Sequence, residues 1–298
     1  MQIPRRPVSA SGSDTARLPT ISAPGGPTTR LLDVDVVTGR TPPPWAAYVV
    51  EDGVCADADR VLITHGPATV YVAGGDEVVI SPLTPQDRLS HDFLVYGWGL
   101  RWLLLQRRRF ALHASVVISP TGQCIAIAGF SGEGKSTTTG ELLSRGWTFV
   151  CDDLAEVDVT SGTALLVPHD RPVHLHADSI RRLGADPEIG RPLPWTGKLA
   201  VRVSPDMTPR PLDAILQLQA TGDRVGTQRI EPAAAVSIVG LHGDPDWIGH
   251  IPELSGDFFR WVTGVADNVP VFDVTRPADS DTRQEVADAV ERIAADIR

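Results

Sequence analysis

The sequence predicts a mixed α/β domain over residues 89–298, preceded by a small β-rich domain at residues 31–88 and a flexible tail at residues 1–30. Three observations indicate this fold class. Short β-like runs broken by Pro and Gly fill the first part of the chain after the tail. A predicted strand then leads into a glycine-rich loop and a helix. From there to the C-terminus, β-like and helical segments are mixed, which is typical of α/β architectures.

The N-terminal third contains the tail and the β-rich domain. Residues 1–30 are rich in Ser, Thr, Pro and Gly and lack the apolar block of a secretion signal, so we expect a flexible tail. The β-like runs after it are LLDVDVV, AAYVVED, RVLITH, TVYVAG and EVVIS. Residues 87–109 have apolar side chains at helical spacing, interrupted by Gly97 and Gly99, and we expect one helix there.

The second domain is expected to begin with a β-hairpin in LHASVVISPTGQCIAIAG, with its turn at residues 120–122. The second hairpin strand enters the glycine loop, which precedes a helix from about Lys135 to Gly146 and the strand WTFVCDD. Further strands are expected in ALLVP, RPVHLHA, AILQLQA and VPVFDV, and further helices at residues 232–243, at 255–266 and at the C-terminus.

Bulk properties narrow the function classes. The chain has 298 residues and no apolar run near the roughly 20 residues of a membrane span, so we expect no membrane partner. A net charge of -10 argues against nucleic-acid binding. Three cysteines without a CxxC pair favour a reducing, cytoplasmic setting. The basic cluster at residues 107–109 ends a predicted helix, where cations favour the helix dipole.

The motif that carries chemistry is GFSGEGKS, residues 129–136, which matches the P-loop (Walker A) pattern. In such a loop, backbone N–H groups surround phosphates, the Lys reaches the outer phosphates and the hydroxyl binds Mg²⁺. An ordinary glycine turn is the alternative. We expect ATP to contact the loop and the start of the helix through Gly129, Ser131, Gly132, Glu133, Gly134, Lys135, Ser136 and Thr137.

Lysine usage supports this interpretation. Of 27 basic residues only Lys135 and Lys198 are Lys. A compact ammonium fits between phosphate oxygens where a planar guanidinium does not. We therefore expect Lys135 to serve the phosphates.

Two carboxylates follow the next predicted strand. Asp152 and Asp153 lie 17 and 18 residues after Lys135. Adjacent side chains on a strand point to opposite faces, so one Asp can serve Mg²⁺ and the other the acceptor hydroxyl. We assign Asp152, with Ser136, to the metal, and the identity of the general base is left open. The alternative is a simple turn or helix cap.

Three further features have weaker signals. His113 begins the hairpin strand beside the loop and is a candidate catalytic residue, although a lone His is more often structural. His174 and His176 share a strand face and suggest a metal site, but no third ligand is spaced with them. The segment RPLPWTGK, residues 191–198, is either a surface loop or a substrate contact.

Taken together, the His-bearing hairpin, GFSGEGKS and the strand-end DD resemble the HPr kinase/phosphorylase family, and more closely the HPr-kinase-like enzymes that act on ribosomally made peptides, including lasso-peptide kinases. The likeness covers roughly residues 110–275, through LHASVV, the P-loop, LLSRGWTFVCDD and VPVFDVTRP. It implies a phosphoenolpyruvate-carboxykinase-like P-loop kinase fold. It also implies a catalytic-site position for His113 and metal or base roles for Asp152 and Asp153.

The function hypothesis is an ATP- and Mg²⁺-dependent serine kinase that phosphorylates a peptide or small protein, in particular a lasso-type precursor peptide. An HPr-type kinase/phosphorylase is one alternative, although HPr kinases commonly have an acidic residue where this chain has Thr137. A small-molecule hydroxyl kinase and a nucleotide-binding switch without transfer are others. A homo-oligomer is left open.

Overall fold

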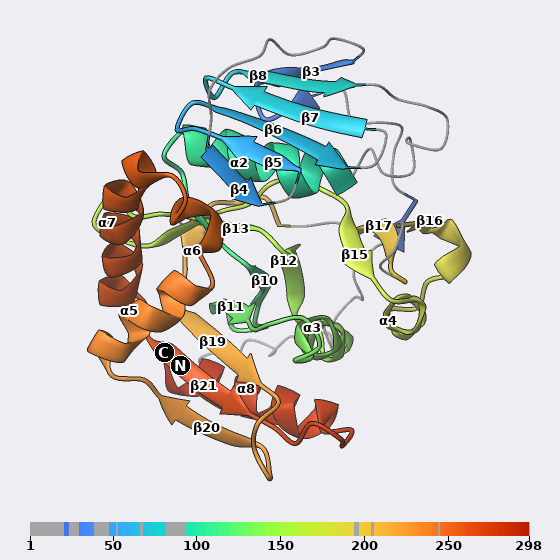
Figure 1. Cartoon of the computed structure of the whole chain (residues 1–298). Helices are drawn as coiled ribbons and strands as arrows, with labels where there is room; N and C mark the ends of the chain where they lie inside the picture. The colour runs from blue at the N-terminus through green and yellow to red at the C-terminus, as the bar shows by residue number, and fades with distance from the viewer. Residues whose placement is uncertain are drawn as a thin grey trace, which may run out of the picture.

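A computed structural model describes residues 21–23, 30–38, 48–51, 53–65, 68–81, 93–193, 197–203, 206–243 and 245–297. Within these residues the protein has a mixed α/β fold built around several sheets (Figure 1). No described helix is both long enough and apolar enough to cross a bilayer.

The central element is a six-stranded mixed sheet in the order β12-β10-β11-β19-β21-β20. The predicted hairpin is confirmed, because β10 and β11 pair antiparallel in continuous register. The strands from AILQLQA and VPVFDV extend the sheet parallel to β11. The six strands are β10 (Ala114–Ile118), β11 (Cys124–Ala128), β12 (Thr148–Cys151), β19 (Ala214–Gln219), β20 (Gly226–Arg229) and β21 (Val271–Thr275).

Both faces of this sheet are buried, which explains why β10 and β11 are buried at every position rather than alternating with exposed residues. Ile125 and Ile127 of β11 pack in one hydrophobic cluster with α3 (Lys135–Ser144) and α8 (Arg283–Asp296). Ala126 packs in a second cluster on the other face with α5 (Pro232–Leu241) and α7 (Pro252–Asn268). The helices expected from the sequence are therefore present and sandwich the sheet. A short helix, α6 (Pro245–Ile248), lies between α5 and α7 in the chain.

The strand directions bring chemistry to one edge of the sheet. Because β10 runs antiparallel to both β11 and β12, these two strands point the same way. The parallel strands β19 and β21 share that direction. The segments after β11, β12 and β21 therefore meet at the edge where β10 begins, as ligand sites of α/β sheets commonly do.

The β-like runs expected between residues 31 and 85 form a seven-stranded sheet in the order β2-β3-β8-β7-β6-β5-β4, drawn at the top of Figure 1. Its buried side chains belong to the same hydrophobic cluster as those of α5 and α7. The division into two domains stays a prediction. The strands are β2 (Arg30–Leu31), β3 (Val34–Thr38), β4 (Tyr48–Glu51), β5 (Val54–Ala56), β6 (Arg60–His65), β7 (Ala68–Ala73) and β8 (Glu77–Ser81).

The predicted helix at residues 87–109 is present in its described part, with a π-helical start at Phe93–Gly99 (η1) and an α-helical end at Leu100–Gln106 (α2). The helix is π-helical rather than α-helical over Phe93–Gly99, the part that contains Gly97 and Gly99, which weaken α-helical propensity. The three arginines after it make ion pairs, in which Arg107 contacts Asp33, Arg108 contacts Asp257 and Arg109 contacts Glu156.

Two smaller sheets complete the fold. One has the order β18-β14-β13-β9, and in the other β17 pairs with β1, β15 and β16. Within the expected tail, Ile21–Ser22 forms β1, while residues 1–20 and 24–29 lie outside the described part. The remaining elements are β9 (Ala111–Leu112), β13 (Ala155–Asp158), β14 (Leu165–Val167), β15 (Val173–Leu175), α4 (Ala177–Arg182), η2 (Pro187–Ile189), β16 (Arg191–Pro192), β17 (Leu199–Val203) and β18 (Arg210–Pro211).

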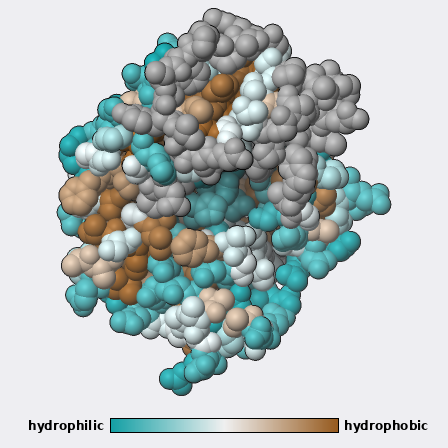
Figure 2. Space-filling view, viewed as in Figure 1, coloured by the Kyte–Doolittle hydropathy of each residue, from teal (hydrophilic) through white to brown (hydrophobic). Residues whose placement is uncertain are grey.

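On the face shown in Figure 2, hydrophobic residues gather at the left of the view, over the region of α5 to α7. Two large apolar side chains of these helices are exposed, Leu241 at 42% and Phe259 at 63%.

Candidate functional site

The glycine loop between β11 and α3 has a backbone that only glycine adopts easily. Gly129, Gly132 and Gly134 have φ values of 151°, 90° and 105°. A Cβ on Gly129 would lie 2.8 Å from the Leu218 carbonyl oxygen of the neighbouring strand β19. The loop is therefore shaped by its glycines and pressed against the sheet.

The helix after the loop presents its N-terminus to the sheet edge. Helix α3 begins at Lys135, its N-cap is Gly134, and no side chain in the described part of the chain caps it. The first N–H groups of a helix have no partner within the helix and favour anions. Ser136 is half-buried in this first turn and Thr137 is exposed, while Ser131 and Gly132 are exposed at the loop tip and Glu133 is half-buried.

The Lys135 side chain folds back over the loop. Its Nζ donates to the carbonyl oxygens of Gly129 at 2.5 Å and Phe130 at 3.3 Å. Burial lowers the pKa of Lys135, and the charges of Asp152 and Asp153 oppose that shift. Both carboxylates therefore lie close enough to the ammonium to act on it electrostatically.

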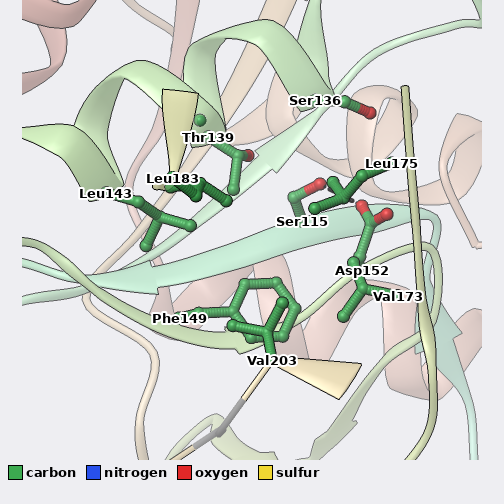
Figure 3. Close-up of a pocket in the computed structure, with 11 residues that line it drawn as sticks. Ser115, Ser136, Thr139, Leu143, Phe149, Asp152, Val173, Leu175, Leu183 and Val203 are labelled. Carbon is green, nitrogen blue, oxygen red and sulfur yellow. Dashed lines mark hydrogen bonds between the residues drawn. The ribbon is translucent and has the colours of Figure 1, made fainter. Parts of the chain in front are cut away.

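Asp152 directly follows β12 and is buried, with 8% of its surface exposed. It accepts a hydrogen bond from the Ser115 hydroxyl of β10. Ser115, Ser136 and Asp152 line one cavity together with Thr139. In Figure 3 the side chains of Ser115 and Asp152 lie beside each other below Ser136, and the apolar side chains of Phe149 and Val203 lie beneath them. Hard oxygen ligands of this kind suit Mg²⁺, which proteins commonly hold through one or two carboxylates and substrate phosphates.

Asp153 turns the other way. Its φ of 72° places it in the left-handed region, and its Oδ1 lies 3.0 Å from His113 Nδ1 while its Oδ2 accepts from Arg171 Nη2 at 3.3 Å. Burial alone would raise the pKa of Asp153, but the His113 hydrogen bond and the Arg171 charge outweigh it and hold the pKa well below the usual value. The two neighbouring carboxylates thus have separate partners, and Asp153, one-third exposed, is the accessible one.

His113 is held by its ring, which contacts Asp153, and by its backbone. Its backbone N–H donates to the carbonyl oxygen of His242 at 2.7 Å, at the end of α5. Burial, together with the charges of His113 and Lys135, lowers the pKa of His242 to about 4. The ring of Phe130 lies 5.7 Å from the His242 ring, so the exposed aromatic of the loop covers this side of the site.

The histidine pair on RPVHLHA does not form a metal site in the described residues, where no group of three or more His, Cys, Asp and Glu side chains could hold an ion. His174 lies within β15, while His176 is exposed just before α4. The expected shared strand face is not observed, because β15 ends before His176, and the two side chains differ in burial. The metal interpretation of this pair is not supported.

Arg276 is a site residue that the sequence did not reveal. It follows β21, and its guanidinium donates to the carbonyl oxygens of Glu133 at 2.9 Å and Gly132 at 3.3 Å, and to Pro277 at 2.8 Å. These bonds hold the carbonyl oxygens of Gly132 and Glu133 toward Arg276. No sequence pattern marks this contact, because it joins residues 143 positions apart.

Lys198, the second lysine, lies near the site in space. Its charge contributes to lowering the pKa of Lys135 and of His174. It directly precedes β17, which pairs with β15. Of the segment RPLPWTGK, residues 194–196 lie outside the described part, and Arg191–Pro192 forms β16.

Comparison with known proteins gives partial matches. No family model matches the chain. It is 43% identical over 77 residues to proteins called HPr kinase/phosphorylase from two strains of Treponema pallidum, one of them the Nichols strain. Each match covers 25% of this chain and 23% of the relative, so the chain spans less than a quarter of the length of these relatives.

A solved structure of the Hpr(Ser) kinase/phosphatase from Coxiella burnetii is similar over 63% of this chain and 97% of its own, at 12% identity and a TM-score of 0.32. A score this low does not establish a shared fold. The sequence match is therefore the comparison that bears on function.

Proposed function

We propose that the protein is an ATP-dependent kinase that transfers the γ-phosphate to a Ser hydroxyl of a peptide or small protein. The observation that carries the proposal is the convergence at one sheet edge of a P-loop, a buried carboxylate beside the P-loop serine and a second carboxylate paired with His113. A nucleotide-binding switch needs the loop but not the second carboxylate.

The residues divide the work by position. The loop N–H groups, the start of α3 and Lys135 bind the phosphates. Ser136 and Asp152 would hold Mg²⁺, which neutralises charge on the phosphates when bound. Asp153 is accessible, ionised and oriented by His113, so it accepts the proton of the acceptor hydroxyl. Phosphoryl transfer depends on such positioning and charge stabilisation more than on covalent chemistry by the protein.

Two acceptor classes compete. The 77-residue match to proteins called HPr kinase/phosphorylase favours a folded protein acceptor and a reaction that inorganic phosphate reverses. The resemblance to peptide-modifying kinases, and Thr137 in place of an acidic residue after the P-loop serine, favour a peptide, including a lasso-type precursor. A small-molecule acceptor is a weaker candidate, since the hairpin and the long N-terminal segment precede the loop.

The test of the kinase proposal is Lys135→Ala. We expect it to lose ATP binding in calorimetry and phosphate transfer to Ser-containing peptides, because this side chain lies over the loop and supplies its cation. The matched control is Arg260→Gln, which changes an exposed residue of α7 and should bind ATP with the affinity of the parent protein. Undiminished binding by Lys135→Ala would remove the P-loop assignment.

A second assay separates the acceptor classes. Phosphorylated product is incubated with the enzyme and inorganic phosphate. Efficient return of the free hydroxyl would favour the HPr-type kinase/phosphorylase, whereas a product that stays phosphorylated would favour the peptide kinase.

A further inference from the structure

Arg171, in the loop between β14 and β15, is a buried cation whose hydrogen bonds are incomplete. Its side chain is 3% exposed and its Nη2 donates to Asp153 at 3.3 Å, a long bond. Its Nε and Nη1 are buried and have no hydrogen-bond partner in the described residues. These two nitrogens carry three of the five N–H donors of the guanidinium.

Two other groups lie beside Arg171. His174 follows it on β15, and its Nε2 is also buried without a hydrogen-bond partner among the described residues. In the antiparallel pair β15 and β17, His174 is opposite Ala200, so Lys198, two residues before Ala200, lies toward the same face of the sheet. Burial and the nearby charges of Arg171 and Lys198 lower the pKa of His174 to about 4, so its ring is neutral near pH 7.

The cluster lies against the candidate active site. Arg171 contacts Asp153 directly, and the charges of Asp152 and Asp153 act on His174. On the other side, Lys198 acts on Lys135 of the P-loop. Arg171 therefore adjoins the carboxylate that we assign to the acceptor hydroxyl, while His174 and Lys198 lie within electrostatic range of the site.

A buried charged group whose N–H donors lack hydrogen-bond partners destabilises a protein, because those donors have lost their water and gained nothing in exchange. Arg171 makes one long hydrogen bond to Asp153, and His113 contacts the same carboxylate. The described residues therefore offset little of the cost of burying the Arg171 charge. An oxyanion would accept from its remaining N–H groups, and guanidinium geometry suits carboxylate and phosphate oxygens.

We propose that Arg171, His174 and Lys198 form an oxyanion-binding subsite next to Asp153, which holds a carboxylate or phosphate group beside the reacting hydroxyl. This inference rests on the proposed function, because it describes the substrate chemistry of the same site. The oxyanion has two sources: an acidic group on the acceptor near its hydroxyl, or the phosphoryl group in transfer.

The experiment titrates inorganic phosphate into the full chain by calorimetry, in chloride buffer, in two nucleotide states. One sample is saturated with Mg²⁺ and a non-hydrolysable ATP analogue, the other with Mg²⁺ and ADP. Phosphate binding in both states indicates a subsite for an acidic group on the acceptor. Binding only with ADP indicates the position of the transferred phosphoryl group.

Arg171→Gln should weaken phosphate binding at least about tenfold in whichever state shows it, because one charge-assisted partner is lost. Lys198→Gln changes a half-buried residue rather than a buried one and should weaken binding in the same direction, which covers the case that Arg171→Gln does not fold. Arg181→Gln is the control, since Arg181 is 61% exposed on α4 and, among the residues that the structure describes, pairs locally with Asp178.

Absence of phosphate binding in both states, or equal affinity in the parent and both subsite variants, would overturn the inference. Failure of the proposed function has a different signature. In that case the nucleotides do not bind in the loading step, and loss of phosphate affinity in Arg171→Gln without nucleotide would still support the subsite.

Discussion

Arg276→Gln tests whether the P-loop is held in shape from outside. Arg276 reaches from the end of β21 to the carbonyl oxygens of Gly132 and Glu133, and its guanidinium passes 3.4 Å from the position of a Cβ on Gly134. Glutamine is too short and has too few donors to make these bonds together. The loop should then sample conformations in which its N–H groups no longer converge.

The expected magnitude follows from the two lost bonds to the loop. One is partly buried and the other exposed, so each contributes about 1 kcal/mol net. A loss of about 2 kcal/mol reduces the population of the binding-competent loop about 30-fold. The apparent Kd for ATP rises by the same factor when the loop must first be ordered.

Calorimetry with a non-hydrolysable ATP analogue measures the change directly, and thermal unfolding without nucleotide shows whether the fold survives. Arg260→Gln is the control, because Arg260 is 73% exposed and its ion-pair partner within the described part of the chain is Asp257, three residues before it. A Kd for Arg276→Gln within about twofold of the parent would refute the reasoning, since a twofold change is only about 0.4 kcal/mol.

Three other predictions concern the site and the core. Asp152→Asn and Asp153→Asn should both retain nucleotide binding but lower the transfer rate by about 10²–10⁴-fold, and extra Mg²⁺ should partly rescue only Asp152→Asn in a peptide phosphorylation assay. Gly129→Ala should weaken nucleotide binding, because the new Cβ would lie 2.8 Å from a backbone carbonyl oxygen. The control is Gly140→Ala in α3, where a Cβ meets nothing within 4 Å. This variant should bind nucleotide normally, and its free energy of unfolding in denaturant should rise by about 0.5–1 kcal/mol. Burial and the charge of a nearby Asp raise the pKa of Cys124 to about 12, so its thiol stays protonated at pH 8. Cys124 should therefore react with a maleimide only after the protein unfolds, as mass spectrometry of the labelled protein would show.

Local chemistry accounts for the parts of the fold that the sequence predicted. Glycine spacing, a following Lys-Ser and an apolar run before them are all adjacent in the chain, so the strand, loop and helix from residue 124 to residue 144 were predictable. The hairpin at residues 114–128 was predictable for the same reason, since its turn residues lie between its strands. The sequence also placed the aspartates directly after β12.

Sequence patterns did not predict the irregular or distant features. The π-helical turn at Phe93–Gly99 has the same apolar spacing as an α-helix over so short a length. In the four-stranded sheet, β14 was expected from ALLVP, but its neighbours β18, β13 and β9 have only two to four residues, too few for a clear alternating pattern.

The sequence by itself determined the chemical inventory of the site: a phosphate loop, one lysine within it, two neighbouring carboxylates and a histidine at the start of a strand. Only the tertiary structure decided which side chains meet them. Ser115 of β10 donates a hydrogen bond to Asp152, which follows the neighbouring strand β12. Arg171 and His113 both contact Asp153, and Arg276 donates hydrogen bonds to the P-loop. The physical reason is that strand order and direction, set by burial on both faces of the central sheet, bring residues from distant parts of the chain to one edge.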